Sequence, residues 1–302
     1  MILRPRPSAF GLLFTLRGSV VLTIAPRVFV VLLVSAAVTW LYHAHPALPE
    51  LTPAPFTLLG LALSIFLGFR NNACYDRWWE ARKQWGQLIV ETRCLVRDVL
   101  TLLPADDALR RRIGLRAIAF AASLRAQLRG VDGAEARDWL PAEERDGVRL
   151  RRNRPDAVLR ELSLDLGARL REGDITDILY QLIERRLTAM SSIQAACERL
   201  RSTPTPFTYT LLLHRTAWLF CLLLPFGLVG SLGTATPILS TILAYAFFGL
   251  DALGGELEEP FSRSQNAVPL DALVRGIEID VLEVLGEADL PAPLQAERFI
   301  LP

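Results

Sequence analysis

The chain has 302 residues, and its 33 Lys and Arg nearly balance its 32 Asp and Glu, for a formal net charge of +1. A near-neutral chain argues against nucleic-acid binding, because a phosphate backbone demands a strongly basic surface. Uncharged apolar blocks lie near the N-terminus and between 216 and 250, around a charged middle. This segregation is typical of a membrane protein with a sizeable water-exposed part.

The first apolar stretch runs from Ser19 to Tyr42 and is interrupted only by Arg27. It is long enough to cross a bilayer core, with Arg27 extending toward the inner surface and Trp40 at the outer interface. Residues 1–18 carry arginines and aromatics and are expected to form an interfacial lead-in. The apolar run continues past signal-peptide length, so no cleavable signal peptide is predicted.

A second apolar stretch, Leu51–Phe69, follows a Pro-rich connection at 43–54 that has no Lys or Arg. Basic residues come directly after it, at Arg70, Arg77, Arg82 and Lys83. Lys and Arg mark the cytoplasmic end of a span, so the first two spans are predicted to form a hairpin with its tip outside. Arg70 itself is expected at the interface, either as a snorkelling side chain or at the inner mouth of an ion path.

The segment Pro55–Trp85 turns from apolar to polar without a helix breaker, which predicts one long helix that leaves the lipid halfway along. Bulky residues recur in its first half at i, i+4 and i+8, and therefore form one row on a helix. The row consists of Leu61, Ile65 and Phe69.

Small residues recur at the same spacing beside that row, at Gly60, Ser64 and Gly68. Such a pattern lets helix backbones approach closely in a bilayer, so these three are predicted to serve helix packing. A closely packed ring of these helices would turn the bulky row inward, as in a hydrophobic constriction. The spacing alone also allows the alternative that the row contacts the core or lipid.

The charged middle is predicted to be helical, because apolar residues recur near the helical period and no strand alternation is found. The predicted helices continue from the second span to 104 and then cover Ala108–Leu128, Asp156–Arg171 and Asp174–Leu200, followed near the C-terminus by Pro269–Gly286. Residues 130–154 are expected to form short helical pieces and loops, and Asp174 is expected to be an N-cap.

Tyr209–Leu250 is predicted to hold two spans joined by a turn at Gly230–Pro237. Arginines precede this pair and the turn is uncharged, so both termini of the chain are expected in the cytoplasm of a multi-pass protein of the cell (inner) membrane. Asp251, at the inner end of the last span, is expected to pair with a basic group or to line the ion path. The predicted organisation is all-α: spans one and two in 1–69, a cytoplasmic helical domain in 70–206, spans three and four in 207–254, and a cytoplasmic segment in 255–302.

Three motifs together resemble the bacterial bestrophins, and the resemblance covers nearly the whole chain. They are LGFRNNACYDRWWEAR at 67–82, RSTPTPFTYTLLLHR at 201–215 and DALGGELEEPF at 251–261. The resemblance implies a homopentameric, passive ion channel in which five copies of the second span line a narrow neck. It assigns the neck rings to Leu61, Ile65 and Phe69, the row that helical spacing also singles out, and a cytoplasmic exit constriction to Ile175.

Two departures from the animal members bear on function. Their calcium-binding acidic cluster follows the Pro-Phe motif, whereas Pro260-Phe261 is followed here by residues without a carboxylate until Asp271, so no calcium activation of that type is expected. Whether Glu256, Glu258 and Glu259 bind a cation weakly is left open. Ile65 replaces a phenylalanine of the animal neck and removes an electropositive ring edge, which gives a weak lean toward cations such as sodium over chloride.

No catalytic residue, metal site or cofactor is predicted. His43 and His45 form an incomplete metal shell, and the four cysteines form no close pair. The predicted partners are copies of the same chain, small monovalent ions and the lipid bilayer. The alternatives are a chloride channel of the same fold, and a membrane carrier or scaffold without channel activity. An enzyme is not expected, because ionisable groups lie only at the inner ends of the spans.

Overall fold

The computed structural model describes residues 1–3, 10, 15, 18–45, 52–103 and 105–302. Within these ranges the chain is helical, with only isolated β-bridges such as Ile2–Ile300, and this confirms the all-α prediction for the described residues. The chain divides into two compact units. We call residues 4–78 and 204–260 the apolar unit, and residues 1–3, 79–203 and 261–302 the charged unit.

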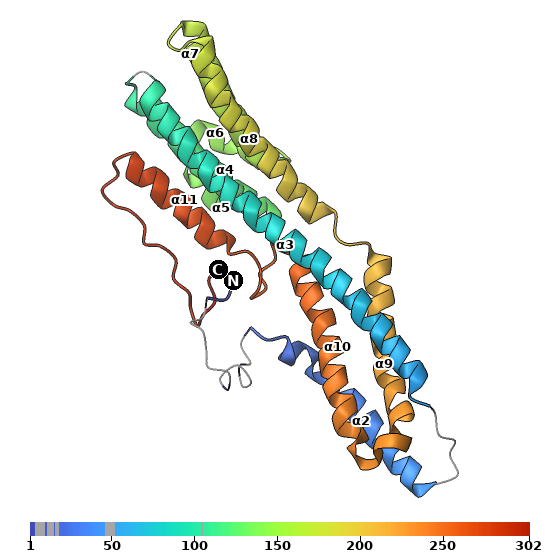
Figure 1. The fold of residues 1–302 in the computed structure, drawn as a ribbon. Coiled ribbons are helices and arrows are strands. Elements are labelled where there is room, and N and C mark those ends of the chain that lie inside the picture. The colour runs from blue at the N-terminus through green and yellow to red at the C-terminus, as the bar shows by residue number, and fades with distance from the viewer. Residues whose placement is uncertain (4–9, 11–14, 16–17, 46–51, 104) are drawn as a thin grey trace. The chain divides into compact units, whose positions relative to one another are not determined.

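The apolar unit is a bundle of long helices (Figure 1). It contains α2 (Val21–Ala44), the first half of α3 (Ala54–Leu102), α9 (Phe207–Leu232) and α10 (Thr236–Glu258), with the short 3₁₀ helix η1 (Gly233–Ala235) between the last two. The second apolar stretch does continue into the polar sequence as one helix, since α3 has 49 residues without interruption. The expected turn at 230–237 coincides with η1 and the helix ends beside it.

Buried apolar side chains from all four helices hold this bundle together. They include Ile24 and Val31 of α2, Leu63 and Leu67 of α3, Phe220 and Leu224 of α9, and Phe247 and Phe248 of α10. Gly60 allows α3 to approach α9, because a Cβ at that position would lie 3.0 Å from the ring of Phe220.

Three helical stretches of the described residues are long and apolar enough to cross a membrane: Val21–Ala44, Ala54–Leu102 and Phe207–Glu258. The third stretch contains α9, η1 and α10. The 24 residues of α2 rise through about 36 Å, which exceeds a hydrocarbon core of about 30 Å.

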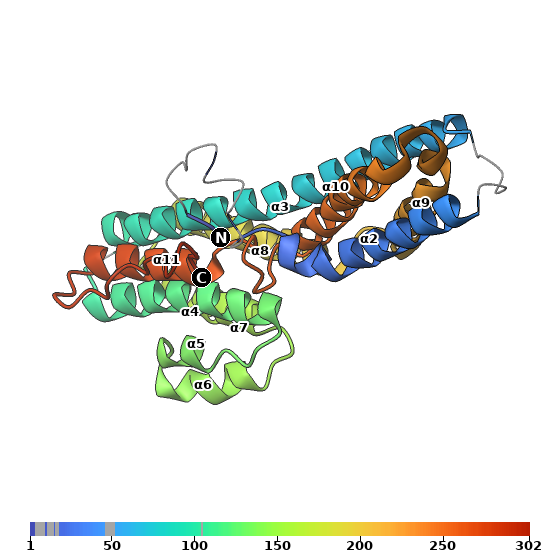
Figure 2. The ribbon, with the colours of Figure 1, turned by 90° about the horizontal axis from the view of Figure 1, so that it is seen from below.

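The charged unit contains the second half of α3 and a set of shorter helices (Figure 2). They are α4 (Asp107–Arg129), α5 (Ala134–Asp138), α6 (Ala142–Arg149), α7 (Arg154–Glu172), α8 (Asp177–Ser202) and α11 (Leu270–Val284). The predicted helices of the middle segment and the helix near the C-terminus are confirmed to within three residues at each end. Side chains at two N-caps explain the starts of α4 and α7: Asp106 accepts from Leu109 N at 2.9 Å, and Asn153 from Asp156 N at 3.2 Å.

The prediction of Asp174 as an N-cap is wrong. The N-cap of α8 is Thr176, whose hydroxyl accepts from Leu179 N at 3.4 Å. Asp174 instead pairs with Arg169 at 3.0 Å, across the turn that follows α7. The sequence offers two capping residues two positions apart, and the ion pair decides between them.

Ion pairs join the helices of the charged unit. Arg116 of α4 is 3% exposed and donates to Asp165 of α7 at 2.6 Å and to Glu144 of α6 at 3.0 Å. Asp271 of α11 pairs with arginines of α4. Burial opposes ionisation of its carboxyl, but hydrogen bonding and charge from those arginines prevail and lower its pKa.

Some sequence expectations lie outside the described residues. They concern most of the interfacial lead-in, at 4–9, 11–14 and 16–17, the middle of the Pro-rich connection at 46–51, and residue 104 after the end of α3.

Candidate functional site

The bulky row of α3 faces away from its own bundle. Leu61, Ile65 and Phe69 are 59%, 48% and 61% exposed, whereas Leu63 and Leu67 on the opposite side of the helix are buried. At 1.5 Å per residue the three side chains are spaced about 6 Å apart along the axis and cover about 12 Å. The apolar unit therefore presents a continuous row of large apolar groups that its own helices leave uncovered.

The small residues beside the row have different surroundings. Gly60 packs against Phe220 within the bundle, as described above. A Cβ at Gly68 would have no atom within 4 Å, and the exposed Ser64 hydroxyl donates to the Gly60 carbonyl at 2.8 Å. Packing through Ser64 and Gly68 is thus not made inside this chain and stays a prediction for an assembly.

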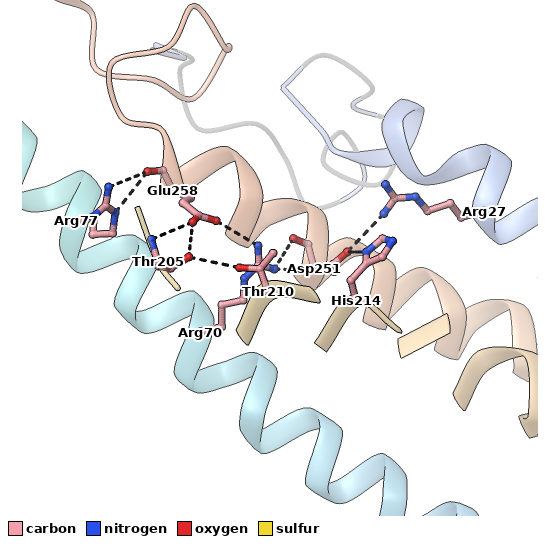
Figure 3. A network of polar contacts seen from close by, with 8 residues as sticks. All are labelled: Arg27, Arg70, Arg77, Thr205, Thr210, His214, Asp251 and Glu258. Carbon is pink, nitrogen blue, oxygen red and sulfur yellow. Dashed lines mark hydrogen bonds and ion pairs between the residues drawn. The ribbon is translucent and has the colours of Figure 1, made fainter. Parts of the chain in front are cut away.

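Arg70, the residue after the row, is buried rather than interfacial. It is 2% exposed, and its Nη1 donates to the Asp251 carboxylate at 2.9 Å and to the Asp251 carbonyl at 3.1 Å (Figure 3). The expectation of a snorkelling Arg70 is therefore wrong. A basic partner for Asp251 is confirmed.

Asp251 collects further polar partners from two other helices. His214 of α9 contacts its Oδ2 through Nδ1 at 2.8 Å, and Arg27 of α2 approaches the same oxygen at 3.4 Å (Figure 3). Asp251 is 6% exposed, so these partners replace the water that a carboxylate would otherwise keep. One carboxylate thus joins all four long helices of the apolar unit.

Glu258, two turns beyond Asp251 on α10, forms the second half of the network. Arg70 Nη2 reaches its carboxylate at 3.5 Å, and Arg77 donates to its backbone carbonyl at 3.4 Å. The carboxylate also accepts from the Thr205 amide at 3.1 Å, while the hydroxyls of Thr205 and Thr210 lie 3.4 Å apart (Figure 3). All three motifs identified in the sequence contribute to this network, although they lie up to 188 positions apart.

A glycine makes room for the Arg70 side chain. A Cβ at Gly254 would lie 2.5 Å from Asn71 Oδ1 and 3.1 Å from Arg70 Nη1. A side chain at this position would displace the Asn71 amide and crowd the Arg70 guanidinium, so glycine suits this face of α10.

The network was not foreseen from the sequence as a unit. Opposite charges at the inner ends of apolar stretches, such as Arg27, Arg70 and Asp251, were the available signal. Periodicity along one helix gives no information on which helices lie next to each other, so the pairing could not be derived.

The expected exit residue has a different environment from the row. Ile175 is 4% exposed and is held within the charged unit, whereas Ile178, one turn later in α8, is 72% exposed. A constriction at Ile175 remains a prediction, but its side chain is not uncovered as those of the row are.

A metal site needs several ligating side chains close together. Groups of three or more His, Cys, Asp or Glu suited to a metal are absent from the part of the chain that the structure describes. His43 Nδ1 lies 2.8 Å from the carbonyl of Thr39, one helical turn earlier.

A family model described as Bacterial/Fungal Bestrophin protein matches residues 1–283. The chain belongs to the bestrophin family. The network thus lies in a bestrophin, and all three of the motifs that build it fall inside the matched range.

Curated bestrophin relatives match along nearly their full length. A protein of Mesorhizobium japonicum is 46% identical over 301 residues, covering 99% of this chain and 96% of its own. A protein of Escherichia coli K12 is 42% identical, with 99% and 98% covered. Both are named voltage-dependent anion channel-forming proteins.

Solved bestrophin structures share the fold. The crystal structure of a bestrophin homolog from Klebsiella pneumoniae is 39% identical, with a TM-score of 0.84 over 88% of this chain and 100% of that one.

Replacing the central carboxylate tests whether the network supports the bundle. Asp251→Asn removes the nearer of the two carboxylates that pair with the buried Arg70 and leaves only Glu258, at 3.5 Å. Breaking one partner of a buried ion pair costs about 3–5 kcal/mol. We expect a clear loss of thermal stability of the purified protein in detergent, measured by its unfolding midpoint.

Asp280→Asn is the matched control, because Asp280 forms an ion pair with Arg93, whose side chain is 60% exposed. Exposed pairs contribute less than about 1 kcal/mol. Equal unfolding midpoints for the two variants would contradict a structural role of the network.

Proposed function

We propose that this bestrophin is a passive ion channel that conducts small monovalent ions through a hydrophobic neck lined by Leu61, Ile65 and Phe69. The observation that carries the proposal is the exposure of this row on a membrane-capable helix whose other face is buried. The names of the relatives, anion channel-forming proteins, support the same activity. They also favour a channel over an enzyme.

The proposed assembly is a homopentamer, as the family resemblance implies. Five copies of α3 would turn their rows toward a common axis. Ser64 is exposed, and a Cβ at Gly68 would meet no described atom within 4 Å, so both positions leave room for contact with a neighbouring copy. Three apolar rings about 6 Å apart would oblige an ion to shed water or to pass a wetted opening. Such rings bind ions weakly and therefore permit passage.

We propose four membrane crossings, made by α2, the first half of α3, α9 and α10. The 3₁₀ helix η1 then forms the outer turn between the last two crossings. Basic residues follow the second crossing and precede the third, which favours cytoplasmic termini and a cytoplasmic charged unit in a multi-pass protein of the inner membrane.

The first measurement is ion flux in liposomes that contain the purified protein. A channel gives flux down a gradient that does not saturate at low ion concentrations. Slow, saturable and gradient-coupled flux would instead identify a carrier, and the absence of flux would identify a scaffold.

The relatives' names favour anions, and they do not support the weak lean toward cations drawn from Ile65. We therefore propose a small monovalent anion such as chloride as the first permeant ion to test. A cation channel is the second candidate, favoured by the aliphatic side chain at the middle ring.

The first prediction about conduction concerns the width of the neck. Ile65→Ala removes bulk from the middle ring in every subunit, so we expect a severalfold rise in single-channel conductance in planar bilayers. Leu33→Ala is the control, because Leu33 is 54% exposed on α2, outside the row. Unchanged current in Ile65→Ala would remove this residue from the constriction.

The second prediction concerns selectivity. Ile65→Phe adds aromatic edges that are electropositive and attract anions. The reversal potential under a salt gradient is expected to shift toward that of chloride. An unchanged reversal potential would reject the middle ring as a selectivity element.

Exposure within the single chain supports a second candidate for the cytoplasmic exit. We propose Ile178, at the start of α8, as the residue that narrows the cytoplasmic exit, in place of Ile175. A constricting side chain must leave its own subunit, and of the two isoleucines only Ile178 is uncovered.

The two isoleucines form a matched pair for testing. Ile178→Ala is expected to raise conductance with little effect on stability. Ile175→Ala is expected to lower stability by about 2–5 kcal/mol, because it leaves a cavity. Conductance and the unfolding midpoint, measured on both variants, decide the assignment, and it fails if only Ile175→Ala raises the conductance.

A further inference from the structure

The charged unit contains a basic cavity far along the chain from the bulky row. Its volume is about 190 Å³, and it lies among the end of α4, the helix α5 and the start of α7. Within the charged unit α4 packs against both α5 and α7 (Figure 2). Four arginines and one aspartate line it, which gives a formal charge of +3: Arg137, Arg151, Arg152, Arg154 and Asp132.

The single carboxylate is already engaged and leaves most of this charge uncompensated. Asp132 accepts from Arg137 at 2.9 Å and pairs with Arg154 at 3.2 Å. Its pKa is lowered, chiefly by the hydrogen bond from Arg137, so the group stays ionised at neutral pH. Asp132 therefore serves two arginines and has no capacity to neutralise the other two.

Three of the four arginines that line the cavity have donor groups without a partner among the described residues. The side chains of Arg151 and Arg152 make no hydrogen bond or ion pair with any residue that the structure describes. Arg137 Nη1 is buried and likewise has no acceptor among them. A buried N–H without an acceptor is costly, and a ligand that accepts hydrogen bonds removes that cost.

The size and the donors of the cavity narrow the chemistry of the ligand. Its volume exceeds the roughly 30 Å³ that one water occupies, and is below the roughly 300 Å³ at which pockets for drug-sized ligands begin. Guanidinium groups match oxyanions through paired N–H donors, which a halide cannot use in the same directional way.

We propose that this cavity binds a phosphate group, carried by a small free phosphate compound or by a lipid headgroup. Arg151 and Arg152 supply the charge that attracts the ligand, and Arg137 Nη1 supplies the buried donor that fixes one oxygen. The site is separate from the neck, and its existence does not depend on ion conduction.

The test is calorimetric titration of the full-length protein in detergent with inorganic phosphate, pyrophosphate and glycerol 3-phosphate, in a chloride buffer. Saturable binding of phosphate or pyrophosphate supports the site with a free phosphate as ligand. Binding of glycerol 3-phosphate alone supports the site and shows that it requires a phosphate esterified to glycerol, the group that a lipid headgroup carries. No binding of any of the three overturns the proposal.

The variant that tests the assignment is Arg151→Gln/Arg152→Gln. Both side chains are exposed, so the fold is expected to survive, and the affinity is expected to fall by about tenfold or more because two charged donors are lost. The single change Arg152→Gln is expected to give a smaller loss.

Arg160→Gln/Arg171→Gln is the matched control, since it removes the same charge from exposed positions on α7 that do not line the cavity. Equal losses of phosphate affinity in the two double variants would show that the effect comes from overall charge and would overturn the proposal. Unchanged affinity in Arg151→Gln/Arg152→Gln would also overturn it.

Discussion

The arrangement of the apolar unit depends on the burial of one guanidinium. Arg70 lies at the point where α3 leaves its apolar sequence, and an arginine at 2% exposure is tolerated only with counter-charge at hand. Asp251 and Glu258 supply it from α10. Because residues 63, 67, 70 and 74 follow one another at helical spacing, fixing Arg70 toward α10 also fixes the rotation of the whole helix. The row at 61, 65 and 69 then has to face the other way.

The same network explains why the three motifs have the composition they do. Gly254 of DALGGELEEPF provides the space that the Arg70 guanidinium occupies beside α10. The segment STPTPF brings the Thr205 amide to Glu258 at the point where α9 is about to begin. Each motif contributes what the others lack: the positive charge, the carboxylates, and the backbone and hydroxyl donors. Loss of any one leaves a buried polar group unsatisfied, which is why they act as a set.

Features that depend on residues close together in the sequence could be predicted, whereas features that depend on residues far apart in the sequence could not. Helices in the charged unit were predicted nearly to their ends, because periodicity and caps such as Asp106 and Asn153 are local. Thr176 took the place of Asp174 as a cap because Arg169, five residues away, attracts the carboxylate. The spacing of Leu61, Ile65 and Phe69 predicts that they form one row on α3. Their exposure could be known only from the way α2, α9 and α10 pack against the other side of that helix. The burial of Arg70 could not be predicted from its neighbours in sequence, because its partners are 181 and 188 residues away.

The charge balance of the network limits where ion selectivity can arise in the proposed channel. Three arginines, Arg27, Arg70 and Arg77, meet two carboxylates, and each guanidinium is turned toward Asp251 or Glu258 (Figure 3). With three arginines and two carboxylates the network keeps a formal charge of +1, but most of its guanidinium charge is paired, so in the proposed channel it offers only a weak electrostatic preference for anions. Discrimination at the row then rests on ring size, on wetting and on the edge of Phe69, all of which are weak. In the proposed channel, a hydrophobic row held in place by a largely paired ion-pair network would favour passage of small ions over strong binding of any one of them.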